Sequence, residues 1–253
     1  MGKAKDLIVK PISAQDANRI IKALHYSGKV VNNSQVHLGV FMDGKCGGAM
    51  QFGPSLDKRK IQGLVTGTLW NEFIELNRMA FADWLPRNGE SRCIGYALRW
   101  LKKTYPWMKW VVSFADGTQC GDGTIYRASG FVLTQVKENT SMWINNETGE
   151  RRQDMQFFHT GTLAERKTGK WSKVKGYMIR YIYFLDPTAR DRLTVPILPF
   201  SEIDKRGAGM YKGKQRLQGA SSETNDTPGV HPGEGGEAPT DALHKSGGKI
   251  THA

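Results

Sequence analysis

A cluster of proton-exchanging side chains stands out near the start of the chain. His25, Tyr26 and Ser27 follow one another directly, and each can donate or accept a hydrogen bond. They come just after a segment, 13–24, whose apolar spacing and leading Ser13 predict a capped helix. We interpret His25 as a candidate base or orienting group, with Tyr26 and Ser27 as substrate contacts. A plain helix end, at which a histidine complements the helix dipole, would contain the same residues.

A carboxylate, Asp116, follows a run of β-forming residues at 110–115. Ligands of open α/β sheets bind at the carboxyl ends of such strands. Asp116 is therefore a candidate general base, and Thr118 and Gln119 are candidate substrate-binding residues. The alternative is structural, with Asp116 capping the loop that it begins.

Two charges interrupt an otherwise apolar strand that we predict at 71–82. Simple alternation places Arg78 on one face with Ile74, and Glu75 on the other face, so the two would not pair directly. A charge inside a sheet layer is costly unless it is paired or used. Arg78 is therefore a candidate ligand-binding residue, and membership of a structural ion-pair network is the alternative.

The loop 87–92 precedes a predicted helix with a regular apolar face. Gly89 would let backbone approach a ligand, and a helix N-terminus offers free N–H groups to an anion. Arg87 and Arg92 add two cations. An ordinary helix start, capped by Asn88 or Ser91, would have the same composition.

The order of predicted elements indicates an α/β fold with a mixed sheet. A strand–helix–strand unit over 71–115 predicts a right-handed crossover between two parallel strands. The remaining elements are a strand at 7–9, a hairpin at 36–42 and 46–52 turned by Asp43-Gly44, a short helix at 124–129 ended by Gly130, a strand from Phe131, and strands at 141–144, 153–159 and 177–185.

The charge distribution favours a polyanionic partner. The formal net charge is +12, yet residues 220–253 contain two Lys and five Asp or Glu, so the rest carries about +15. A merely soluble basic protein is the alternative. The expected phosphate contacts lie in a loop at 58–60 and in a stretch without apolar periodicity, where one tryptophan could stack on a base. They are Lys58, Arg59, Lys60, Arg166, Lys167, Lys170, Trp171, Lys173 and Lys175.

Composition also suggests how the chain is divided. We expect a catalytic domain over 1–200, a basic extension over 201–219, and a disordered acidic tail rich in Gly and Pro over 220–253. The three cysteines are far apart, which fits a reducing cytosol, and no run of residues is apolar enough to span a membrane. A metal site at His25, His37 and Asp116 has no supporting ligand spacing.

Longer stretches of the sequence resemble a known family. The order of elements and Tyr126-Arg127-Ala128-Ser129-Gly130-Phe131 resemble the GNAT acetyltransferases. Over 7–215 the chain is similar to the Mom DNA-modification proteins of Mu-like bacteriophages. That likeness is carried by the segments 25–34, 51–58, 73–81, 110–131 and 180–187.

The resemblance implies a function and several roles. It implies a GNAT-like transferase that acts in the host cytoplasm and adds a carbamoylmethyl group to the N6 amine of adenine in double-stranded phage DNA, protecting it from restriction. Tyr126 matches the position of a GNAT general acid. Ser91 lies where those enzymes hold a pyrophosphate, so Ser91, Glu90, Arg92 and Arg78 become candidate donor-binding residues.

The donor loop departs from the GNAT pattern. Only Gly89 lies in it, and Glu90 brings negative charge to the anion site, which weakens the case for acetyl-CoA. An aminoacyl-tRNA donor, which would make tRNA a second partner, agrees with the basic body. An N-acetyltransferase of a small amine or protein and a non-enzymic DNA-binding protein are the alternative functions. The sequence leaves the oligomeric state open, a homodimer included.

Overall fold

The computed structural model describes residues 3–118, 121–211 and 214–215. The chain separates into two units, 1–220 and 221–253, and the account below concerns the first. The acidic tail and Gln119 lie outside the described residues.

The main element of the fold is a sheet of seven strands in the order β1-β2-β3-β4-β5-β10-β6. Only the β4–β5 pair is parallel among the described pairings of this sheet, and the others are antiparallel. The strands are β1 (Ile8–Pro11), β2 (Val36–Met42), β3 (Lys45–Gly53), β4 (Phe73–Phe81), β5 (Trp110–Asp116), β6 (Val132–Asn139) and β10 (Gly176–Phe184). This sheet and the order of its elements confirm the predicted α/β fold with a mixed sheet.

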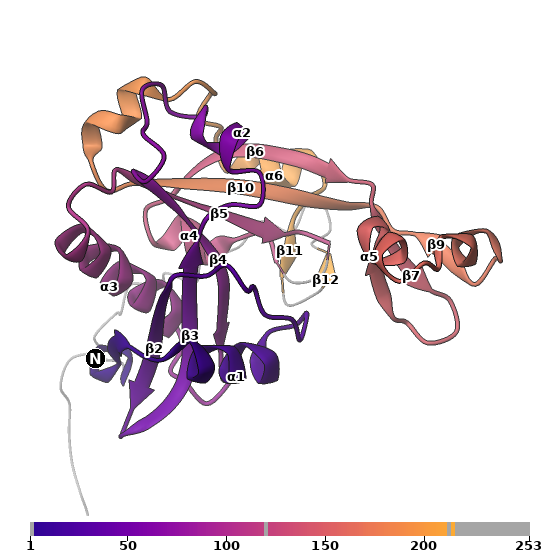
Figure 1. Cartoon of the computed structure of the whole chain (residues 1–253), viewed down its shortest axis with the longest axis horizontal. Helices are drawn as coiled ribbons and strands as arrows, with labels where there is room; N and C mark the ends of the chain where they lie inside the picture. The colour runs from indigo at the N-terminus through magenta and orange to yellow at the C-terminus, as the bar shows by residue number, and fades with distance from the viewer. Residues whose placement is uncertain (1–2, 119–120, 212–213, 216–253) are drawn as a thin grey trace, which may run out of the picture. The chain divides into compact units, whose positions relative to one another are not determined.

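Helices cover both faces of the sheet (Figure 1). The amphipathic helix α3 (Gly89–Thr104) buries Ile94 and Leu101 in the larger core, together with Leu76 of β4. Helix α1 (Ala14–Leu24) packs Ala17 and Ile21 on the opposite face. Burying such stripes stabilises the fold by roughly 25 cal/mol per Å² of apolar surface.

Several local predictions are confirmed. The β2–β3 hairpin turns at Asp43 and Gly44, which both have positive φ, as the tight turn requires. Helix α4 (Thr124–Ala128) is followed by Gly130 at φ 83°, in the left-handed region. Ser13 caps α1 by accepting a hydrogen bond from the backbone N–H of Asp16.

Two predictions about local structure are wrong. The predicted loop at 58–60 is helix α2 (Lys58–Gln62), because the Asp57 side chain caps it by accepting from the Lys60 N–H. The predicted strand at 153–159 is mostly helix α5 (Asp154–His159), which a capping box between Gln153 and Gln156 starts.

A smaller sheet follows β6 and forms a lobe together with α5. Its strands β7 (Met142–Asn145), β8 (Arg151–Gln153) and β9 (Trp171–Lys173) are antiparallel, in the order β8-β7-β9. Figure 1 shows the lobe at the end of the long strands β6 and β10. The other described elements are the 3-10 helices η1 (Lys3–Asp6), η2 (Leu163–Lys167) and η3 (Pro187–Arg192), helix α6 (Ser201–Lys205), and the pair β11 (Met210–Tyr211) and β12 (Lys214–Gln215).

The segment predicted as a basic extension contributes to the main core. Ile203 of α6 and Ala208 are buried in the cluster that also contains Tyr177 of β10. The Tyr177 hydroxyl donates to the backbone carbonyl of Arg206. Residues 201–208 are therefore packed against the sheet.

Candidate active site

A cavity of about 1060 Å³ opens where β4 and β5 part. The two strands pair only from Phe73 to Leu76 on β4 and from Trp110 to Ser113 on β5. The Ser113 hydroxyl donates to the Leu76 carbonyl at the last paired position. Beyond it the strands separate, so the residues that follow face open space, as at the carboxyl ends of other parallel strands.

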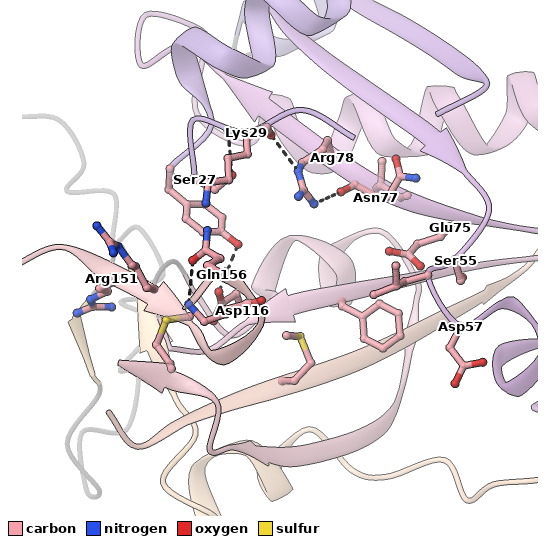
Figure 2. Close-up of a pocket in the computed structure, with 18 of the residues that line it drawn as sticks. Ser27, Lys29, Ser55, Asp57, Glu75, Asn77, Arg78, Asp116, Arg151 and Gln156 are labelled. Carbon is pink, nitrogen blue, oxygen red and sulfur yellow. Dashed lines mark hydrogen bonds between the residues drawn. The ribbon is translucent and has the colours of Figure 1, made fainter. Parts of the chain in front are cut away.

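A β-bulge in β4 shapes the floor of the cavity. The pairing of β4 with β3 shifts at this point, so that Asn77 is an extra residue between Leu76 and Arg78. The predicted opposite placement of Glu75 and Arg78 is wrong, because the bulge resets the alternation. Both side chains line the cavity, and Figure 2 labels them there.

Near the bulge, the cavity is lined by polar side chains whose hydrogen bonding is incomplete. Burial raises the pKa of the Glu75 carboxyl, while the Ser55 hydroxyl and the Arg78 charge oppose that rise. Within the described residues, the buried atom Asn77 Nδ2 reaches no hydrogen-bond partner, and Ser55 Oγ has none apart from its interaction with the Glu75 carboxyl. Such atoms are costly unless a ligand or water satisfies them, which points to a binding site.

Asp116 stands at the carboxyl end of β5 and lines the same cavity. Its Oδ1 accepts a hydrogen bond of 2.9 Å from the Thr118 N–H, so the loop cap expected as the structural alternative is present. Its Oδ2 lies 3.5 Å from the Tyr26 hydroxyl, which donates to it. The carboxylate is thus oriented by groups from two distant parts of the chain.

His25 is held in its neutral form next to Ser27, a residue that lines the cavity. The Ser27 N–H donates to its Nδ1 at 3.2 Å, and Ser27 Oγ lies 2.8 Å from the same atom. These contacts assign the proton of the neutral ring to Nε2. Burial, and then the charge of Arg78, lower the pKa of His25 to about 4.

The structure brings together part of the predicted set. Tyr26, Ser27, Arg78 and Asp116 all line the cavity. His25 reaches it through Ser27, and Thr118 through its hydrogen bond to Asp116.

The predicted donor-binding residues of α3 lie elsewhere. Glu90 and Arg92 are exposed, and the Arg92 guanidinium lies over the ring of Tyr96. Asn88 and Ser91 do not cap the helix with their side chains; Ser91 Oγ instead donates to the Asn88 carbonyl. Neither Ser91 nor its two charged neighbours line the cavity.

Tyr126 is packed within the main core. Its ring is buried against Phe131 and Tyr181, with centroids 5.4 and 5.2 Å away. It lies on α4, which follows the loop after Asp116, but it does not line the cavity.

The predicted DNA contacts fall into three environments. Arg59 and Lys60 are exposed on α2, and Lys58 lies over the rings of Trp70 and Phe73. Arg166 forms an ion pair of 2.6 Å with Asp154, and Trp171 is buried under Phe157 and Arg152, which cover the ring expected to stack on a base. The remaining four residues, Lys167, Lys170, Lys173 and Lys175, are exposed.

Sequence reasoning did not assign the cavity residues that come from the lobe. Strand β8 contributes Arg151, whose guanidinium donates to the Thr118 carbonyl at 2.6 Å and so ties the lobe to the loop after β5. Helix α5 adds Gln156, and the loop after α1 adds Lys29. The sequence carried no signal for them, because their approach to the cavity depends on contacts between segments far apart in the chain.

The described residues contain neither a cluster of metal ligands nor a membrane-spanning helix. No group of three His, Cys, Asp or Glu side chains in this part of the chain is placed to hold a metal ion. None of the described helices is long and apolar enough to cross a membrane.

Solved structures of acetyltransferases share the general arrangement at a low level of similarity. An acetyltransferase from Bacillus subtilis in complex with CoA has a TM-score of 0.43 and 8% identity, over 70% of this chain and 98% of that one. The ribosomal-protein-S18-alanine N-acetyltransferase from Escherichia coli has a TM-score of 0.41 and 11% identity, over 71% and 94%. These scores are too low to carry an argument about function.

The mixed sheet, with its cavity between two parting parallel strands, defines an α/β protein with a candidate binding site at its strand ends. Sequence comparison then gives the family. The Mom protein family matches residues 6–202. The methylcarbamoylase mom of Escherichia phage Mu is 36% identical over 215 residues, which is 80% of this chain and 85% of that protein. The chain belongs to the Mom protein family.

Proposed function

We propose that this chain is a DNA-modifying transferase that adds a carbamoylmethyl group to the N6 amine of adenine in phage DNA. Membership of the Mom family and the name of its methylcarbamoylase relative support this class of activity. The observation that carries the proposal is the cavity itself. It joins a carboxylate, Asp116, to the tyrosine hydroxyl of Tyr26 in a space large enough for an extruded base.

The reaction begins with adenine leaving the base stack, because its amine is too crowded for attack within a duplex. In our proposal the N6 amine attacks the donor and Asp116 accepts the proton that the amine loses. His25 orients the base, since its neutral ring has a hydrogen on Nε2 and its Nδ1 is already occupied by Ser27. Arg78 places a positive charge beside the reacting groups.

The donor needs residues that bind it and an acid that protonates its leaving group. Ser91, at the start of α3, and Arg78, in the cavity, would bind the donor, and Tyr126 would protonate the leaving group. The two candidate donors are acetyl-CoA and an aminoacyl-tRNA. Only the second supplies an amino-acid unit. Attack at its ester carbonyl breaks the bond to the tRNA hydroxyl and leaves an aminoacyl amide on N6. For a glycyl unit this amide is an isomer of the carbamoylmethyl product, so a rearrangement must follow the transfer.

The test is mass spectrometry of nucleosides from the DNA of cells that express the chain. We expect a deoxyadenosine that carries a carbamoylmethyl group, and its absence when Asp116→Asn is expressed at the same level. An acetylated amine in place of this product would favour the N-acetyltransferase. DNA that is bound but chemically unchanged would favour a binding protein.

A further inference from the structure

Leu56 is an apolar side chain that is wholly exposed at the edge of the cavity. Its exposed fraction is 102%, and it nevertheless lines the cavity. A single exposed leucine is unremarkable on most surfaces, but this one stands beside the opening that a base must enter.

The chain on both sides of Leu56 is fixed. Ser55, directly before it, is buried at 5% exposure and follows Pro54. Asp57, directly after it, caps α2 through the Lys60 N–H. Figure 2 shows Ser55 and Asp57 near Glu75 and on the other side of the view from Arg151. Leu56 therefore projects from a constrained turn.

Positive charge follows Leu56 immediately. Helix α2 begins with Lys58, and Arg59 and Lys60 are exposed beside it. An apolar tip flanked by cations matches the surface of a duplex, in which an apolar base stack lies between rows of phosphates.

We propose that Leu56 is a wedge that enters the DNA base stack and fills the space left by the extruded adenine. The inference rests on the proposed function, which requires extrusion. Leucine burial in the stack offsets part of the cost of unstacking and unpairing the base. The cations of α2 then contact the phosphates beside the opened base pair.

Other exposed apolar side chains fit this role less well. Met155 and Phe158 are exposed on α5 but do not line the cavity. Tyr26 lines the cavity, but its hydroxyl is directed to Asp116.

The test uses the full chain, without donor, and short duplexes that contain one 2-aminopurine within randomised flanking sequence. The fluorescence of 2-aminopurine increases when the base leaves the stack. We expect an increase with the parental chain and with Ile8→Ala, a control that removes a 60% exposed side chain from β1 at the far edge of the sheet. Leu56→Ala should lose most of the increase. In cells that express the variant, it should also lower adenine modification by about tenfold or more, and Leu56→Met should restore both.

Each outcome bears on the inference. An undiminished fluorescence increase with Leu56→Ala would overturn the role of Leu56, and loss with Phe158→Ala instead would place the wedge on α5. Parental protein that modifies adenine without any fluorescence increase would overturn the wedge and the extrusion step, while the proposed transfer to adenine would stand. A Leu56-dependent increase together with unmodified DNA would refute the chemistry and keep the wedge.

Discussion

Glu75 and Arg78 project into the same cavity from one face of β4. Their numbers differ by three, so an ideal strand would place them on opposite faces. The bulge at Asn77 removes that difference. As a result, one guanidinium acts on two groups: it opposes the rise that burial causes in the pKa of Glu75, and it adds to the lowering that burial causes in the pKa of His25.

Replacing Arg78 with Gln should raise both pKa values. The pKa of His25 should move up from about 4 toward its ordinary value of 6.5, although burial will still hold it below that value. The pKa of Glu75 should rise further above its ordinary range. NMR titration of the histidine ring and of the glutamate carboxyl carbons measures both.

The matched control for this titration is Arg87→Gln, which removes an exposed arginine that does not line the cavity. It should leave the pKa values of His25 and Glu75 where they are. Equal shifts in the two variants would mean that general charge, and not the bulge, connects these groups.

The stability of the fold should depend on the protonation of His25. Its pKa is about 4 when folded and ordinarily 6.5, so between these values the unfolded chain binds more protons. The free energy of unfolding should therefore be greatest above pH 6.5 and fall as pH is lowered toward 4. We expect a loss on the order of 1 kcal/mol, allowing for solvent screening of a part-buried ring.

Urea unfolding of His25→Gln across this range measures that contribution. The variant should show a flatter pH dependence, whereas His159→Gln, a change at an exposed position on α5, should follow the parental curve. Identical slopes for all three proteins would contradict the assignment.

Asp116→Asn should lower adenine modification by ~10²-fold or more, the usual effect of losing a general base. The amide oxygen can still accept from the Thr118 N–H, so the melting temperature should change little. Asp122→Asn is the control, because Asp122 accepts from the Thr124 N–H at the start of α4 and does not line the cavity. That variant should lose about 1 kcal/mol of stability, because the Asp122 carboxylate accepts from both the Thr124 and the Met210 N–H and an amide can keep only one of these bonds. Its activity should fall only as far as folded protein does.

Tyr126→Phe removes only the hydroxyl of a tyrosine that is buried in the main core. The ring that packs on Phe131 and Tyr181 is retained, so the fold and DNA binding should persist. If Tyr126 protonates the leaving group, modification should fall by ~10²-fold. A folded variant with the parental rate would leave Tyr126 with a packing role alone.

Reversing three exposed lysines should weaken DNA binding on every sequence. Changing Lys170, Lys173 and Lys175 to Glu removes phosphate contacts, so affinity should fall and the slope of log K against log salt should decrease by about 2–3. Fluorescence anisotropy at several salt concentrations measures both quantities.

The control for this reversal changes the same net charge on another surface. Arg99, Lys102 and Lys103 are exposed on α3, and their replacement by Glu should have a smaller effect. Equal losses in the two triple variants would mean that general charge, and not contacts made by these three lysines, governs DNA binding.

Sequence reasoning succeeded where structure depends on neighbours along the chain. The apolar stripe of α3, the Asp43-Gly44 turn and the helix stop at Gly130 were all predicted and found. Each depends on side-chain spacing or on backbone torsion within a few residues. Sequence reasoning failed for α2 and α5, because helices this short contain too few residues to show a helical repeat of apolar side chains.

What the sequence determined by itself was the kind of fold, the family, and Asp116 and Arg78 as charges at unusual positions. Only the tertiary structure decided which side chains share the cavity. The Tyr26 hydroxyl donates to Asp116, 90 residues away in the sequence. The Arg151 guanidinium donates to the Thr118 carbonyl. The bulge in β4 places Glu75 and Arg78 on the same face of the strand. These contacts depend on strand divergence and on the pairing register of distant segments, and no local pattern of residues encodes either one.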